Sequence, residues 1–102
     1  PVVPSPIAPG VPSPRQDFAR PDWCPRAATQ TERAICADAR LAALDLELTE
    51  IYLTLARRLG AAAKRELSAD QREWLAYRDT CRADVACIEA TVDRRITDLL
   101  RR

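Results

Sequence analysis

The sequence predicts a small all-α protein: an antiparallel bundle of three to four helices stapled by two disulfides, with an extended Pro-rich N-terminal tail. All eight prolines lie between Pro1 and Pro25. After Trp23, apolar residues recur at helical spacing, no strand-like alternation competes with them, and four cysteines occur in the chain. We therefore expect a tail or linker over residues 1–22 and a helical domain over residues 23–102.

The expected tail begins PVVPSPIAPGVPSPRQ, which alternates proline with small and apolar residues. Proline fixes φ and lacks an amide donor, so this composition favours extended, polyproline-like chain. It is typical of a spacer that holds a domain away from an anchored N-terminus, of a proline-rich ligand or of an inert tail. Because the chain lacks an initiating Met and a basic-then-apolar leader, we expect a trimmed product.

The first two helices begin at recognisable caps. Thr29 stands three residues before Glu32, the spacing of a capping box, which predicts a short helix to about Cys36. Asp38 can cap a second helix, and Gly60 can end it. In that second helix, apolar residues line one face at three- and four-residue steps: Leu41, Leu44, Leu48, Ile51, Leu55 and Leu59.

The pattern then predicts a third helix from about Ala61 to Arg82. One of its faces carries Ala63, Leu67, Trp74, Tyr77 and Cys81. Ser68 and Gln71 repeat the capping-box spacing, but the apolar register continues across them, so we expect one uninterrupted helix. Asp84 can cap a fourth helix, whose apolar residues are Val85, Ile88, Val92, Ile96 and Leu99.

Composition excludes several classes of function. Sixteen basic and fifteen acidic residues give a net charge of +1. This balance does not indicate binding to nucleic acid or to an anionic membrane. The apolar runs are too short to span a bilayer. The absence of histidine excludes histidine-based catalysis and the commonest zinc sites, and Ser68 has no base to activate it. We therefore expect no enzyme, cofactor, metal or nucleic-acid partner.

The cysteines Cys24, Cys36, Cys81 and Cys87 follow the pattern C-x11-C-x44-C-x5-C. Zinc ligands usually lie closer together, and the C-x-x-C of redox enzymes is absent. An even number in a small domain fits disulfides formed outside the reducing cytosol. Three pairings remain open. We favour Cys24 with Cys36 and Cys81 with Cys87, because each closes a short loop at a corner and stabilises the fold by roughly 2–3 kcal/mol.

These motifs together resemble a known family. WCPRAATQTERAICADARLAALDLEL and QREWLAYRDTCRADVACIEATVDRRITDLL resemble the two halves of the lysozyme-inhibitor LprI-like family, small helical domains of the bacterial cell envelope. The resemblance runs from about Trp23 to Leu100 and departs from the family at Pro25 and Val92. Its elements are Thr29 with Glu32, Ala34-Ile35-Cys36, Asp38, Leu41 to Asp45, Gln71-Arg72, Trp74-Leu75, Arg78-Asp79, Cys81, Cys87, Arg95-Ile96 and Leu99.

The resemblance implies a disulfide-bonded domain that is periplasmic, an outer-membrane lipoprotein with its lipid anchor upstream, or secreted. It also implies stoichiometric binding to a lysozyme, or to another envelope protein. The alternative hypothesis is a structural or adaptor domain of the cell envelope that does not inhibit lysozyme.

Two groups of residues are candidates for partner binding. Trp74, Tyr77, Arg78 and Asp79 would form a binding hot spot if exposed; alternatively, both aromatic residues are core and Arg78 pairs with Asp45 or Glu47 as the hub of a polar network. Asp45, Glu47 and Glu50 form an acidic cluster that either meets a basic lysozyme surface or is simply solvated. The connections over residues 26–31 and 82–84 are candidates for insertion into the enzyme cleft.

Overall fold

The computed structural model describes residues 18–102, which form a helical bundle without strands. The elements are the 3-10 turn η3 (Cys24–Arg26) and the helices α1 (Gln30–Ala37), α2 (Ala39–Arg57), α3 (Ala61–Asp79) and α4 (Val85–Leu100). The predicted all-α class is confirmed. The features expected for residues 1–17 lie outside the described residues, and the domain boundary after residue 22 stays a prediction.

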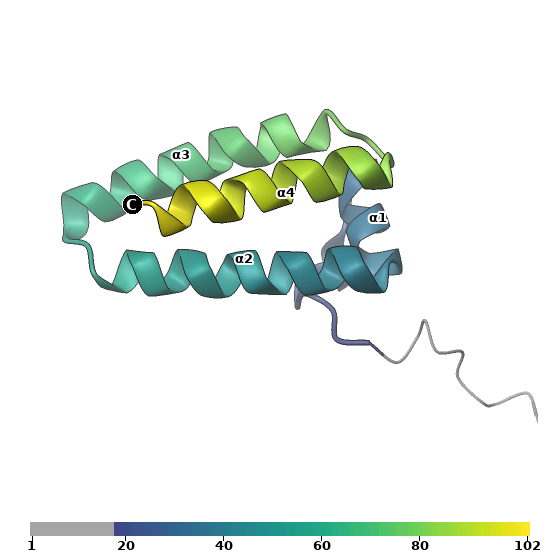
Figure 1. The fold of residues 1–102 in the computed structure, drawn as a ribbon, viewed down its shortest axis with the longest axis horizontal. Helices are drawn as coiled ribbons and strands as arrows, with labels where there is room; N and C mark the ends of the chain where they lie inside the picture. The colour runs from purple at the N-terminus through teal and green to yellow at the C-terminus, as the bar shows by residue number, and fades with distance from the viewer. Residues whose placement is uncertain (1–17) are drawn as a thin grey trace, which may run out of the picture.

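The three long helices lie lengthwise beside one another (Figure 1). Each runs antiparallel to the next along the chain, so α2 and α4 run in the same direction, and α4 packs mainly on α2. The short α1 lies at the end of the bundle where α2 begins and α3 ends, and it packs on both. Chain segments from both halves of the sequence therefore meet at this end.

The predicted helix starts are confirmed. Thr29 accepts the backbone N–H of Glu32 at 3.0 Å, and the Glu32 carboxylate accepts the N–H of Thr29 at 3.0 Å, which completes the capping box. Asp38 and Asp84 each accept the N–H three residues further on. By contrast, α3 begins after Gly60 without a side-chain cap, and it continues through residues 68–71 as one helix.

The apolar core comes mostly from α2 and α4. Its buried members are Ile35, Leu41, Leu48, Leu55, Leu67, Cys81, Ile88, Val92, Ile96 and Leu99. Within α3, only Leu67 and Arg78 are buried, and Trp74 is half-buried against the core. Because α3 presents so little apolar surface to its neighbours, polar side chains must hold much of it in place.

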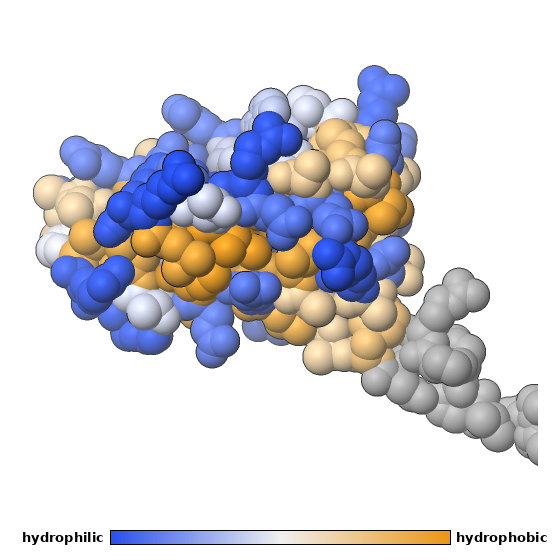
Figure 2. All heavy atoms as spheres, viewed as in Figure 1, coloured by the Kyte–Doolittle hydropathy of each residue, from blue (hydrophilic) through white to orange (hydrophobic). Residues whose placement is uncertain are grey.

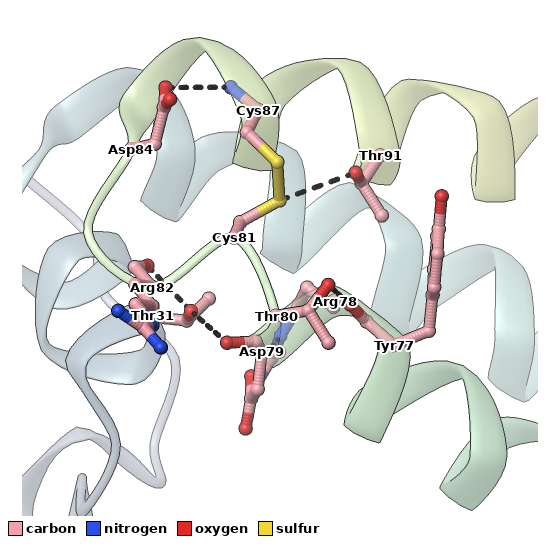
Figure 3. Close-up of a disulfide and its surroundings, with 10 residues drawn as sticks. All are labelled: Thr31, Tyr77, Arg78, Asp79, Thr80, Cys81, Arg82, Asp84, Cys87 and Thr91. Atoms are coloured by element: carbon pink, nitrogen blue, oxygen red, sulfur yellow. Dashed lines mark hydrogen bonds and ion pairs between the residues drawn. A yellow bond between two sulfur atoms is a disulfide. The ribbon is translucent and has the colours of Figure 1, made fainter.

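The corner between α3 and α4 differs from the prediction. Helix α3 ends at Asp79 rather than at Arg82, whose φ of 55° lies in the left-handed region. The buried Thr31 hydroxyl donates to the Arg82 carbonyl at 2.6 Å and lies 3.3 Å from the Asp79 carbonyl (Figure 3). Both carbonyls therefore contact Thr31 of α1, and α3 does not continue past Asp79.

Both favoured disulfide pairings are confirmed. Cys81–Cys87 closes the corner between α3 and α4, and Cys24–Cys36 joins η3 to the last turn of α1. The Arg20 guanidinium also donates through Nε to the Cys36 carbonyl at 2.8 Å. Both bridges lie at the end of the bundle that holds α1, so this end is the covalently reinforced one.

Thr31→Val tests how α1 holds this corner. The substitution keeps the side-chain shape but removes the buried donor, so we expect the free energy of unfolding in urea to fall by about 1–3 kcal/mol. Thr97→Val is the matched control, because the Thr97 hydroxyl is exposed and bonds only within its own helix, to the Asp93 carbonyl. An equal effect of the two substitutions would contradict a special role for Thr31.

Candidate functional site

Trp74 lies between two buried arginines that come from different helices. Its ring centroid is 5.9 Å from the guanidinium carbon of Arg78, on α3, and 5.6 Å from that of Arg95, on α4. Both distances allow cation–π attraction, which is stronger away from water. We call Trp74, Arg78 and Arg95 the Trp74 cluster.

Arg78 links α3 to α2. Its side chain is 3% exposed, and Nε and Nη2 donate to Asp79 Oδ1 at 3.0 and 2.8 Å. Nη1 lies 3.9 Å from Asp45 Oδ1, so the expected pair between Arg78 and a carboxylate of α2 is present. Asp79 is nevertheless the closer partner, and the charge of Arg78 is largely compensated within its own helix.

Asp45 is a buried carboxyl group with an unpaired oxygen. Its side chain is 7% exposed, and Oδ2 has no hydrogen-bond partner among the described residues. Burial raises the pKa of Asp45, and the charge of Arg78 and a side-chain hydrogen bond with Trp23 reverse this only in part. A buried acceptor without a partner lowers stability by about 1–3 kcal/mol.

Arg95 links α4 to α3 through a second polar network. Nε and Nη2 donate to Gln71 Oε1 at 3.0 and 2.7 Å, and ion pairs of 3.1 Å join Arg95 to Asp70 and Asp98. Arg102 pairs with both aspartates at 3.0 Å. Burial acts to raise the pKa of Asp70, but its bonds to Arg102 and Arg95 outweigh this and lower the pKa.

The sequence interpretation did not select Arg95 as a site residue, although a signal for it exists. Arg95 falls on the face of α4 that carries Val92, Ile96 and Leu99, and these residues are all buried. A charged residue within a buried apolar stripe needs a charged or hydrogen-bonding partner. The position of Arg95 thus indicates a buried ion pair, but the partners on α3 become apparent only in the structure.

Of the two alternatives for Tyr77, the one that places it in the core is wrong. Its side chain is 59% exposed, because Tyr77 lies on the solvent side of α3 while Arg78 turns inward. Tyr77 and Trp74 line a hollow of about 510 Å³ between α3 and α4, which Arg94 and Arg101 also border. One edge of the Trp74 cluster is therefore an aromatic and basic surface.

The predicted acidic cluster does not form a single surface. Glu47 and Glu50 are exposed and border a groove of about 420 Å³ between α2 and α4, whereas Asp45 lines a different hollow. The groove also contains Ile51 and Leu100, and Figure 2 shows apolar atoms along the line between α2 and α4, flanked by hydrophilic ones. The prediction of one acidic cluster of Asp45, Glu47 and Glu50 is therefore wrong.

All four cysteines lie in the described part of the chain, and all are in disulfides. Within residues 18–102, no group of three or more His, Cys, Asp or Glu side chains is placed to hold a metal ion. No helix in that range combines the length and the apolar character needed to cross a membrane.

The comparison with known families agrees with the resemblance seen in the sequence. The family model described as lysozyme inhibitor LprI matches residues 24–99. This range includes both disulfides, the Trp74 cluster and all four helices except the last residue of α4. No curated protein and no solved structure matches the chain significantly.

Asp45→Asn tests the buried carboxyl group. Because the folded-state pKa of Asp45 is raised above its ordinary value of 3.8, ionisation disfavours the folded state. We expect the stability of the wild type relative to the variant to fall as pH rises from 3.8 through the raised pKa. The loss is about 1.4 kcal/mol for each pH unit between the two pKa values.

Urea unfolding at a series of pH values measures this difference, and Glu47→Gln is the control with an exposed carboxylate on the same helix. If the wild type instead gains stability over Asp45→Asn as pH rises, the attraction to Arg78 outweighs the effect of burial and our account of Asp45 is wrong.

Proposed function

Because this chain belongs to the lysozyme inhibitor LprI family, we propose that it inhibits a lysozyme by stoichiometric protein–protein contact. The match over residues 24–99 is the observation that carries the proposal. The proposal includes a location outside the cytoplasm, whether periplasmic, lipid-anchored or secreted. Two disulfides support it, since such bonds persist in oxidising compartments and are rare in the cytosol.

For the contact itself we propose the corner between α3 and α4, with Arg82 as the residue that enters the enzyme. Arg82 is exposed and stands between the two bridged cysteines, Cys81 and Cys87. Glycosidases, including lysozyme, act through a pair of carboxyl groups in a cleft. A guanidinium can pair with carboxylates through two parallel hydrogen bonds, so its chemistry complements that of the cleft.

The rigidity of the corner supports this choice. The Arg82 carbonyl is held by Thr31, the Cys81–Cys87 bridge closes the loop, and Asp84 caps the helix that follows (Figure 3). An element already in its bound shape loses less conformational entropy on binding. The left-handed backbone of a residue other than glycine is also strained, and such strain is concentrated at functional sites.

Titration of lysozyme-driven cell-wall clearing tests the inhibition and the contact together. We expect the wild-type protein to stop clearing near equimolar ratio. Arg82→Gly removes the side chain and tolerates the positive φ, and we expect it to raise the half-inhibitory concentration at least about 10-fold, which corresponds to about 1.4 kcal/mol.

Arg58→Gly is the matched control, because Arg58 is an exposed arginine at the other end of the bundle, beside the connection between α2 and α3. A loss of inhibition in Arg58→Gly but not in Arg82→Gly would move the contact to that end. Absence of inhibition by the wild type at large molar excess over several lysozyme types would contradict the proposed function and favour the envelope adaptor.

A further inference from the structure

A small hollow lies where η3, α1, α2 and α3 meet. Its volume is about 300 Å³, enough for the end of one long side chain, and it is the hollow into which Asp45 faces. The polar and aromatic residues that line it are Trp23, Glu32, Asp45, Thr49, Gln71 and Arg78. We call it the Asp45 pocket. Neither the fold nor the contact proposed for Arg82 accounts for it.

The pocket contains a hydrogen-bond acceptor without a donor. Asp45 is more than nine-tenths buried, and its Oδ2 has no hydrogen-bond partner among the described residues. Arg78 does not fill this role, because its nearest approach to Asp45 is 3.9 Å, to Oδ1, and Asp79 binds two of its nitrogens. Trp23 and Arg78 both act on the carboxyl group but leave Oδ2 without a hydrogen bond. Buried carboxylate oxygens normally accept one, so a donor from outside the fold would complete the group.

The charge around the pocket favours a cation. Glu32 is a second carboxylate in the lining, and backbone N–H groups of Ala28 and Thr29 lower its pKa and keep it ionised. Among the described residues that line the pocket, Arg78 is the one positive group. It attracts both carboxylates but hydrogen-bonds Asp79, so the two negative groups outnumber it. Trp23 adds an aromatic ring to the wall, and such a ring attracts a guanidinium or an ammonium group.

We propose that the Asp45 pocket binds the end of a basic side chain, arginine or lysine, on the protein partner. The N–H groups of that side chain donate to Asp45 Oδ2 and to Glu32. They thereby supply the hydrogen bond that Oδ2 lacks within the fold. In naming a lysozyme as the partner, this inference rests on the proposed function. The pocket itself depends only on the geometry described above.

The position of the pocket beside the α3–α4 corner fits a single interface. Thr31 holds the Arg82 carbonyl, and the next residue along α1, Glu32, lines the pocket. A partner seated on this end would receive Arg82 in its own cleft while its basic side chain enters the pocket. Each protein would then insert a basic side chain into an acidic site of the other, which restricts how the two proteins dock.

Binding of small cations to the whole chain tests the pocket directly. Propylguanidine and butylamine reproduce the ends of arginine and lysine, and the indole N–H of Trp23 reports on the pocket in NMR spectra of ¹⁵N-labelled protein. We expect a saturable shift of that signal with at least one probe, beyond the effect of NaCl at equal ionic strength. Asp45→Asn should lose the shift, and Glu47→Gln should keep it.

A second variant fills the pocket without removing its carboxylate. Thr49 lies on the rim of the pocket, four residues after Asp45 on the same helix, so Thr49→Arg places a guanidinium within reach of Oδ2. We expect a Tm higher by a few degrees and no remaining probe binding. Thr54→Arg adds the same charge beside the other groove of α2 and should change neither result.

The outcomes separate this inference from the proposed function. No saturable shift with either probe, or equal shifts in Asp45→Asn and Glu47→Gln, would overturn the pocket whatever the protein does to lysozyme. If the probes bind and the wild type inhibits, Thr49→Arg should weaken inhibition several-fold relative to Thr54→Arg. Unchanged inhibition would overturn the pocket's role in partner binding.

If the wild type does not inhibit, the proposed function and the choice of a lysozyme as the partner fail. The NMR result still decides whether the pocket binds a basic group.

Discussion

The structure depends on the way in which α3 is attached to the rest of the bundle. This helix contributes one buried apolar side chain, Leu67, so hydrophobic burial alone is a weak attachment. Arg95 supplies hydrogen bonds from α4 to Gln71 and Asp70 of α3, Arg78 approaches Asp45 of α2 at 3.9 Å, and both arginines lie against Trp74. Hydrogen bonds are directional, whereas apolar contacts are not, so the bonds of Arg95 restrict the rotation of α3 about its axis.

That rotation has consequences for the surface. Arg78 is directed inward, Tyr77 lies about 100° away around the helix and faces solvent, and the ring of Trp74 lies between core and surface. Because α3 ends at Asp79 and Thr31 binds the carbonyl of Arg82, the chain leaves the helix with Arg82 exposed. The two disulfides and the start of α1 then reinforce the same end of the bundle, where the Arg82 corner and the Asp45 pocket both lie.

The separation of Asp45 from Glu47 shows why closeness in sequence is a poor guide to a helical surface. Two residues along a helix correspond to about 200° of rotation, so these carboxylates face different sides of α2. Asp45 falls on the same face as Leu41 and Leu48 and is buried with them, while Glu47 points toward the groove that α4 borders. Three neighbouring acids are therefore one buried group with an unpaired oxygen and two solvated charges.

The sequence by itself determined the features that arise from local interactions. Helix starts at Thr29, Asp38 and Asp84 follow from side chains that bond the backbone three residues away, and short loops favoured, among three open pairings, the disulfides that the structure contains. Only the tertiary structure decided where α3 stops, which side of it faces solvent and what Arg95 binds. These features depend on Thr31, Asp45 and Gln71, which come from other helices, and no local pattern specifies contacts across so many residues.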